Sequence, residues 1–184
     1  MSGHRKSIRL KDYDYTYEGA YFVTVCVHGR RCVLGHVKNG EMVLNDAGKM
    51  VADYWMELPK RFSNVEMDEY MVMPNHLHGI IVIAGSDRCV SVGAPLVGAL
   101  NNPAKRAGTR PAPTLGEMIG AFKSLTTNEY IRNVKTKKWP AFRRHFWQRN
   151  FYEHVIRNEF DLNQVREYIL NNPAGWETDE YYSV

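Results

Sequence analysis

The sequence predicts an α+β protein in which helices pack on one face of an antiparallel sheet. Three observations favour this class: short runs rich in β-branched and aromatic residues, an Asn-Gly turn among them, and helical apolar periodicity in separate segments. The expected order is strand, strand, helix, strand, strand, helix and helix, with a further strand left open before the last helix. A length of 184 residues suits one domain over residues 1–184.

The predicted strands share β-branched or aromatic composition and lack helical spacing. They are residues 20–27, 32–34, 42–44, 65–73 and 77–83. Asn39-Gly40 is typical of a tight hairpin turn. The segment 77–83 is apolar at successive positions from Ile80 onward, so we expect a central strand covered on both sides.

Three segments carry apolar residues at helical spacing. They are residues 46–58, 115–133 and 159–172. Asn45 can cap the first helix, and Pro59 stands where it should stop. Thr114 and Glu117 form a capping-box pattern for the second, and Pro173 terminates the last.

Two segments depart from this regular pattern. Residues 1–17 form a basic, tyrosine-rich N-terminal arm, and residues 84–113 are dominated by Gly, Pro, Ala and Ser. We expect the second segment to be a flexible loop insertion.

Cysteine usage and hydropathy limit the environment of the protein. Cys26, Cys32 and Cys89 show no C-x-x-C spacing, which argues against a disulfide framework or a cysteine zinc site. No run of eighteen apolar residues is present, so no membrane partner is expected. We therefore predict a cytoplasmic protein.

The net charge of +4 is unevenly distributed. Residues 130–158 hold eight Lys or Arg and one acid, Glu153, interleaved with seven aromatic residues. Cations attract phosphates and aromatic faces stack on bases, so this basic-aromatic segment favours single-stranded nucleic acid as partner. A solvated basic surface over ordinary core aromatics is the alternative.

Two pairs of polar residues are candidates for chemistry. His76 and His78 open a predicted strand, and residues two apart in a strand share a face, so both imidazoles could bind one metal ion. The alternative is two core histidines hydrogen-bonded to the backbone. Tyr168 and Asn172 lie one helical turn apart at the margin of an apolar stripe, where a tyrosine is more often structural.

Three blocks follow one another along the chain: Pro74–His78, Trp147–Asn158 and Tyr168–Trp176. Together they resemble the single-tyrosine HUH transposases, and most closely the REP-associated tyrosine transposases. The resemblance runs in order through residues 19–176. It implies a ferredoxin-like antiparallel sheet with the HUH motif, His76 and His78, on a central strand.

The resemblance also implies roles for individual residues. Tyr168 matches the nucleophile, and His76, His78 and Asn172 match the ligands of a divalent metal ion, for which Mg²⁺ or Mn²⁺ is expected. Gln164 is a weaker candidate for the site. Tyr130 also ends an amphipathic helix, but its surroundings do not match those of the nucleophile.

The expected function is a metal-dependent single-stranded DNA transposase that cleaves and rejoins hairpin-bearing, REP-like DNA through a 5′-phosphotyrosine. The candidate DNA contacts are Arg143, Arg144, Trp147, Arg149 and Arg157. Two alternatives stay open: a catalytically silent hairpin-binding protein of the same fold, and a metal phosphodiesterase that uses water. A monomer acting in cis is favoured over a homodimer.

Overall fold

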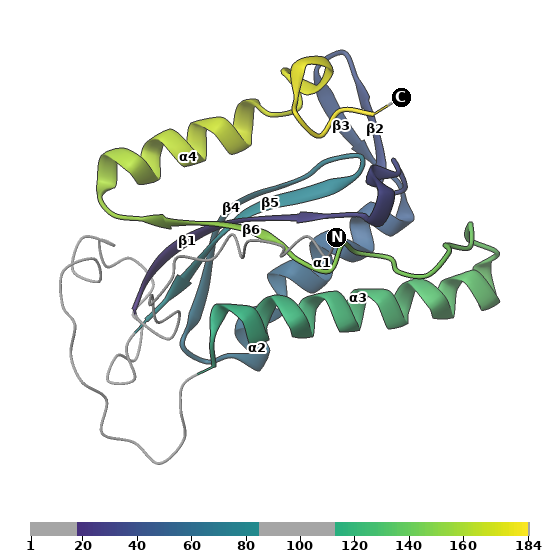
Figure 1. Ribbon diagram of the computed structural model, residues 1–184, viewed down its shortest axis with the longest axis horizontal. Helices are drawn as coiled ribbons and strands as arrows, with labels where there is room; N and C mark the ends of the chain where they lie inside the picture. Colours follow the sequence, from purple (N-terminus) through teal and green to yellow (C-terminus); the bar gives the residue numbers. More distant parts are fainter. Residues whose placement is uncertain (1–17, 85–112, 184) are drawn as a thin grey trace, which may run out of the picture.

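The computed structural model describes residues 18–84 and 113–183 (Figure 1). The predicted N-terminal arm and residues 85–112 of the predicted loop insertion lie outside the described residues.

A four-stranded antiparallel sheet forms the centre of the fold. Its strands are β1 (Gly19–Cys26), β4 (Val65–Val72), β5 (His76–Ile83) and β6 (Tyr152–Ile156), in the order β4-β5-β1-β6. Within the described residues, one helical segment lies between β1 and β4 and another between β5 and β6, which gives the β-α-β-β-α-β connectivity of a ferredoxin-like sheet. The predicted α+β class and antiparallel sheet are confirmed, and β5 is an interior strand.

A separate hairpin joins β1 to the first helix. It consists of β2 (Gly35–Lys38) and β3 (Glu41–Leu44), and its turn residues Asn39 and Gly40 have φ values of 55° and 77°. Two positive φ values define the tight turn that the Asn-Gly pair predicts. The strand predicted at residues 32–34 is wrong. The first strand of the hairpin is Gly35–Lys38, because a two-residue turn pairs Lys38 directly with Glu41.

Three helices cover one face of the sheet: α1 (Asp46–Met56), α2 (Leu58–Arg61) and α3 (Leu115–Lys137). The predicted caps of α1 and α3 are present, since Asn45 accepts a hydrogen bond from the Gly48 N–H and Thr114 forms a capping box with Glu117. The first helix ends earlier than predicted, because Pro59 occupies the first turn of the separate helix α2.

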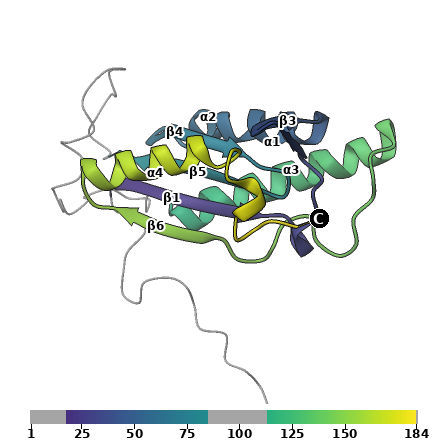
Figure 2. The same cartoon turned by 90° about the horizontal axis from the view of Figure 1, so that it is seen from above.

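The fourth helix, α4 (Glu159–Asn171), lies on the opposite face (Figures 1 and 2). The prediction that all helices pack on one face is therefore wrong for α4. Both faces of the interior strands are apolar: Ile81 belongs to the core with α1 and α3, whereas Ile80 packs with Leu162 and Ile169 under α4. An additional ion pair joins α4 to the sheet, because Arg166 donates two hydrogen bonds to Asp68 of β4 at 2.8 and 2.6 Å.

Within residues 18–84 and 113–183, no helix is both long enough and apolar enough to cross a bilayer.

Candidate active site

His76 and His78 lie at the start of β5, on the face that α4 covers. Both are almost fully buried, with exposed fractions of 0% and 1%. Their Nε2 atoms are 2.8 Å apart, as the two-residue strand spacing predicts for side chains that share a face. This separation is suited to two ligands of a single ion.

The orientation of His76 is set by Asn75. The Asn75 amide nitrogen donates to the carbonyl oxygens of Arg30 and Tyr181 at 3.0 and 2.8 Å, which leaves the Asn75 side-chain oxygen facing His76 Nδ1 at 2.8 Å. That oxygen can only accept, so His76 carries its proton on Nδ1 and keeps a lone pair on Nε2. His78 Nδ1 lies 2.9 Å from the hydroxyl of Thr24, which can donate or accept.

Burial keeps both imidazoles neutral. It lowers the pKa of His76 to about 3, and the positive charge of Arg30 acts in the same direction. Burial and the neighbouring His76 also hold the pKa of His78 well below its ordinary value, although Asp179 opposes them. Neutral imidazoles keep the lone pairs that a metal ion requires.

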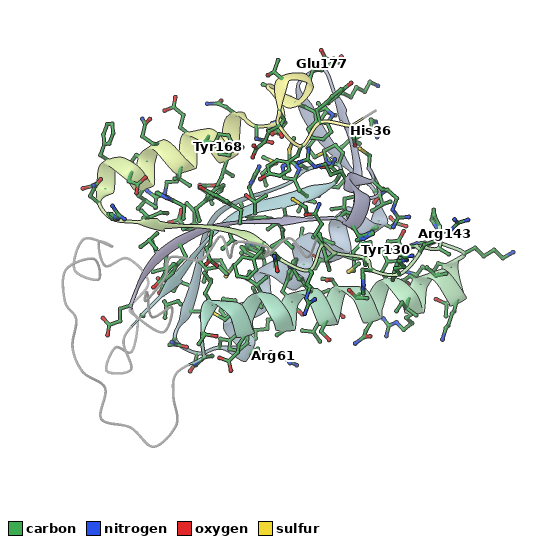
Figure 3. All side chains as sticks on the ribbon, in the orientation of Figure 1. His36, Arg61, Tyr130, Arg143, Tyr168 and Glu177 are labelled. Atoms are coloured by element: carbon green, nitrogen blue, oxygen red, sulfur yellow. The ribbon has the colours of Figure 1, made fainter. Side chains whose placement is uncertain are left out.

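Tyr168 lies on α4 (Figure 3) and contacts His78 across the face of the sheet. Its hydroxyl is 3.4 Å from His78 Nε2, and its ring contacts the rings of His78 and Phe22 at centroid distances of 5.2 and 6.0 Å. The side chain is 44% exposed. Burial and the nearby Asp179 and Glu180 raise its pKa to about 12, although a hydrogen bond with Asn172 opposes them. The hydroxyl is therefore protonated at neutral pH and needs a positive charge nearby to act as a nucleophile.

Asp179 places a carboxylate beside the histidines, and Asn172 is hydrogen-bonded to that carboxylate. Asn172 caps the C-terminus of α4 and donates to the Asp179 carboxylate at 2.9 Å, while its side-chain oxygen is buried without a hydrogen-bond partner among the described residues. Ligand atoms of His76, His78 and Asp179 all lie within 4.8 Å of one another. Two imidazoles and a carboxylate, with an unpartnered amide oxygen nearby, fit a divalent cation.

Sequence reasoning missed Asp179. It follows the last block of the resemblance, in a stretch where Glu177 and Glu180 are also acidic. No local pattern distinguishes the three, and only the path of the chain after α4 brings one carboxylate to the histidines.

The chain after α4 also covers the histidines. The rings of Trp176 and Tyr181 lie 6.0 and 4.8 Å from the ring of His76, and Arg30 lies over Tyr181 at 5.2 Å. A cavity of about 740 Å³ remains beside this segment, and Tyr168, Asn172, Asp179 and Gln164 are among the residues that line it.

The predicted DNA contacts divide into two groups. Arg143, Arg144, Arg149 and Arg157 are exposed, and Figure 3 places Arg143 near the end of α3. Trp147 corrects the prediction: it is 4% exposed, and its indole N–H donates to Thr126 at 2.8 Å. The backbone of Trp147 forms an antiparallel β-bridge with Val27, which follows β1, and the indole packs in the core. The faces of the indole are therefore not open to a base.

Tyr130 is far from this chemistry, as expected. It belongs to the core with α1 and α3, is 2% exposed, and donates its hydroxyl to the carbonyl of Pro140 at 3.0 Å.

Comparisons with known proteins agree with this geometry. No protein-family profile matches the chain. The chain is 39% identical over 184 residues to an uncharacterized protein of Haemophilus influenzae, covering 97% of this chain and 93% of the relative. It is also similar to the structure of a REP-associated tyrosine transposase bound to a REP hairpin, with a TM-score of 0.56, 20% identity, and coverage of 94% of this chain and 73% of that chain. The predicted resemblance is thus confirmed at the level of the fold.

Proposed function

We propose that this chain, which belongs to one family with the Haemophilus influenzae protein, is a single-stranded DNA strand transferase. The proposal starts from its fold, which is that of a REP-associated tyrosine transposase. Tyr168 is the nucleophile, and the substrate is hairpin-bearing, REP-like DNA. The solved structure that supports this substrate contains a REP hairpin.

One observation carries the proposal: the hydroxyl of Tyr168 lies 3.4 Å from His78 Nε2, and His78 lies beside a second imidazole and the Asp179 carboxylate. His76 and His78 would hold a divalent cation together with oxygen from Asn172 or Asp179. Such a cation, Mg²⁺ or Mn²⁺, would polarise the scissile phosphate and offset its negative charge.

The residues of the chain then account for cleavage. The Tyr168 oxygen attacks phosphorus in line and loses its phenolic proton to water, while the bond from phosphorus to the 3′ oxygen breaks and that oxygen takes up a proton from water. The products are a 5′-phosphotyrosine and a free 3′-hydroxyl.

The same residues account for rejoining. A phenol with an unperturbed pKa of about 10 is a far better leaving group than an alkoxide, so a second 3′-hydroxyl can displace Tyr168 and reseal a strand. Neither ATP nor an attacking water is required.

Two further features belong to this proposal. The exposed arginines Arg143, Arg144, Arg149 and Arg157 contact phosphates of the hairpin. The short distance from Tyr168 to His78 of the same chain supports a monomer that acts in cis.

A gel assay tests the proposal against its alternatives. Wild-type protein is incubated with labelled single-stranded hairpin DNA and Mn²⁺, and the products are separated under denaturing conditions. We expect a covalent protein–DNA band that is lost in Tyr168→Phe and His76→Ala and kept in Tyr130→Phe. Binding without cleavage would instead identify a silent hairpin-binding protein, and cleavage that survives in Tyr168→Phe would identify a water-using phosphodiesterase.

A further inference from the structure

Tyr152 begins β6, the strand at one edge of the described sheet. In the strand register Tyr152 pairs with Thr24 of β1, and Thr24 pairs with His78 of β5. Directly paired residues of antiparallel strands point to the same face, so these three side chains form one row on the face that α4 covers. At about 4.8 Å per strand, Tyr152 stands about 10 Å from His78.

The ring of Tyr152 is one side chain away from the nucleophile. Phe22 makes edge contacts with the ring of Tyr152 at 6.2 Å and with that of Tyr168 at 6.0 Å, so it lies between the two. Tyr152 also contributes to the electrostatic environment of Tyr168. An occupant of the space next to Tyr168 can therefore reach the Tyr152 ring.

Tyr152 differs in exposure from the other aromatic residues of the basic-aromatic segment. Of the seven aromatic residues in 130–158, all of them among the described residues, only Tyr152 is exposed, at 43%. Trp147 and Tyr130 are core residues with their polar atoms hydrogen-bonded inside the protein. Trp139, Phe142 and Phe151 are half-buried and pack against the core, so Tyr152 carries the most exposed ring of the segment, one side chain away from the candidate nucleophile.

We propose that the ring of Tyr152 stacks on the nucleobase of a nucleotide that adjoins the phosphate attacked by Tyr168. This inference rests on the proposed function. Every base has a π face, so stacking on Tyr152 would hold the single strand in register without selecting one sequence.

The test uses hairpin oligonucleotides that carry 2-aminopurine or an abasic site at each position flanking the cleavage point. With wild-type protein we expect quenching of 2-aminopurine fluorescence at one flanking position, and about tenfold weaker binding when that position is abasic. Tyr152→Ala should remove the quenching and bind intact and abasic DNA equally. Tyr152→Phe should behave as wild type.

Two controls keep the result interpretable. Tyr152→Leu retains apolar contact with Phe22 without a π face and should behave as Tyr152→Ala, which separates stacking from a loss of folding. Phe160→Ala removes another exposed ring, at the first turn of α4, and should leave quenching unchanged.

The proposal is overturned if Tyr152→Ala and Tyr152→Leu keep the position-specific quenching, or if an abasic site weakens binding equally in wild type and variants. Quenching and binding are measured without turnover. If quenching depends on Tyr152 but the wild-type protein forms no covalent adduct, the stacking proposal holds and only the proposed strand transfer is refuted.

Discussion

The ion pair between Asp68 of β4 and Arg166 of α4 should hold Tyr168 over the histidines, and Asp68→Asn tests this role. Arg166 donates from two nitrogen atoms to the two carboxylate oxygens, and the side chains are 11% and 33% exposed for Asp68 and Arg166. Exposed pairs contribute about 0–1 kcal/mol, whereas loss of one partner from a fully buried pair costs about 3–5 kcal/mol. Because the guanidinium can rehydrate partly, we expect a loss of about 1–2 kcal/mol in the free energy of unfolding.

The catalytic effect should exceed the effect on stability. Tyr168 lies two residues beyond Arg166 on the same helix, and misplacement of a reacting group by about 1 Å can cost about 100-fold in rate. We expect Asp68→Asn to slow formation of the covalent adduct by about 10- to 100-fold with hairpin affinity unchanged.

Urea unfolding and single-turnover adduct formation measure the two effects. The matched control is Glu57→Gln, which breaks the exposed ion pair with Lys60. The Glu57 side chain is 52% exposed and the Lys60 side chain is 75% exposed. If Asp68→Asn and Glu57→Gln have the same urea midpoint and the same adduct rate, the ion pair does not position Tyr168.

The pH dependence gives an independent check. Burial would raise the pKa of Asp68, but hydrogen bonds from Arg166 and the Glu69 N–H, together with the Arg166 charge, leave it below the ordinary 3.8. A carboxylate whose pKa is lowered by folding stabilises the protein above its unfolded pKa and loses that contribution as pH falls through the folded value. The stability difference between wild type and Asp68→Asn should therefore be full at pH 7 and shrink below pH 3.8.

Three other predictions concern separate parts of the fold. Gly79→Ala should lower the free energy of unfolding by about 1–3 kcal/mol in urea titrations, because the added Cβ would overlap the indole of Trp55; an unchanged midpoint would show that the Trp55 side chain can move aside without cost. Asp179→Asn should weaken Mn²⁺ binding about tenfold or more in calorimetric titrations, because the negative charge of the carboxylate beside the histidines is lost, and equal affinities would remove Asp179 from the ligand set. Trp147→Phe should lower the melting temperature, since the hydroxyl of Thr126 loses the indole N–H at 2.8 Å, while hairpin affinity stays the same; a selective loss of affinity would return Trp147 to the DNA interface.

The sequence predicted the parts of the fold that depend on local chemistry. The caps at Asn45 and Thr114 and the Asn39-Gly40 turn each follow from hydrogen bonds or φ values that a few neighbouring residues determine. The strand that holds His76 and His78 was also predictable, because its continuous apolar, β-branched composition is a local property.

Apart from the strand at residues 32–34 and the end of the first helix, the errors concern long-range placement. Whether α4 joins the other helices or takes the opposite face depends on which face of β1 and β5 is still free once α1 and α3 have packed. The apolar residues on both sides of segment 77–83 indicate two cores but do not assign a helix to either.

The candidate site shows the same division. His76, His78, Tyr168 and Asn172 could be named from sequence blocks, and the structure brings them together, but their roles stay predictions. Asp179 could not be named, because a carboxylate acquires this role only through the path of the chain after α4. Trp147 was misassigned because a basic, aromatic-rich sequence does not distinguish a ring on the surface from one in the core.

The central claim is that Tyr168 itself becomes linked to DNA, and mapping of the adduct by mass spectrometry tests it most directly. Tyr181 and Tyr152 are the other candidate tyrosines, since the ring of Tyr181 lies 4.8 Å from that of His76 and the ring of Tyr152 contacts Phe22, which also contacts Tyr168. Trypsin leaves Tyr168 and Tyr181 on one peptide that begins at Glu167, because residues 167–184 contain no Lys or Arg. Fragmentation of that peptide should assign a nucleotide 5′-phosphate to Tyr168, and its assignment to Tyr181, or to the peptide that contains Tyr152, would contradict the account.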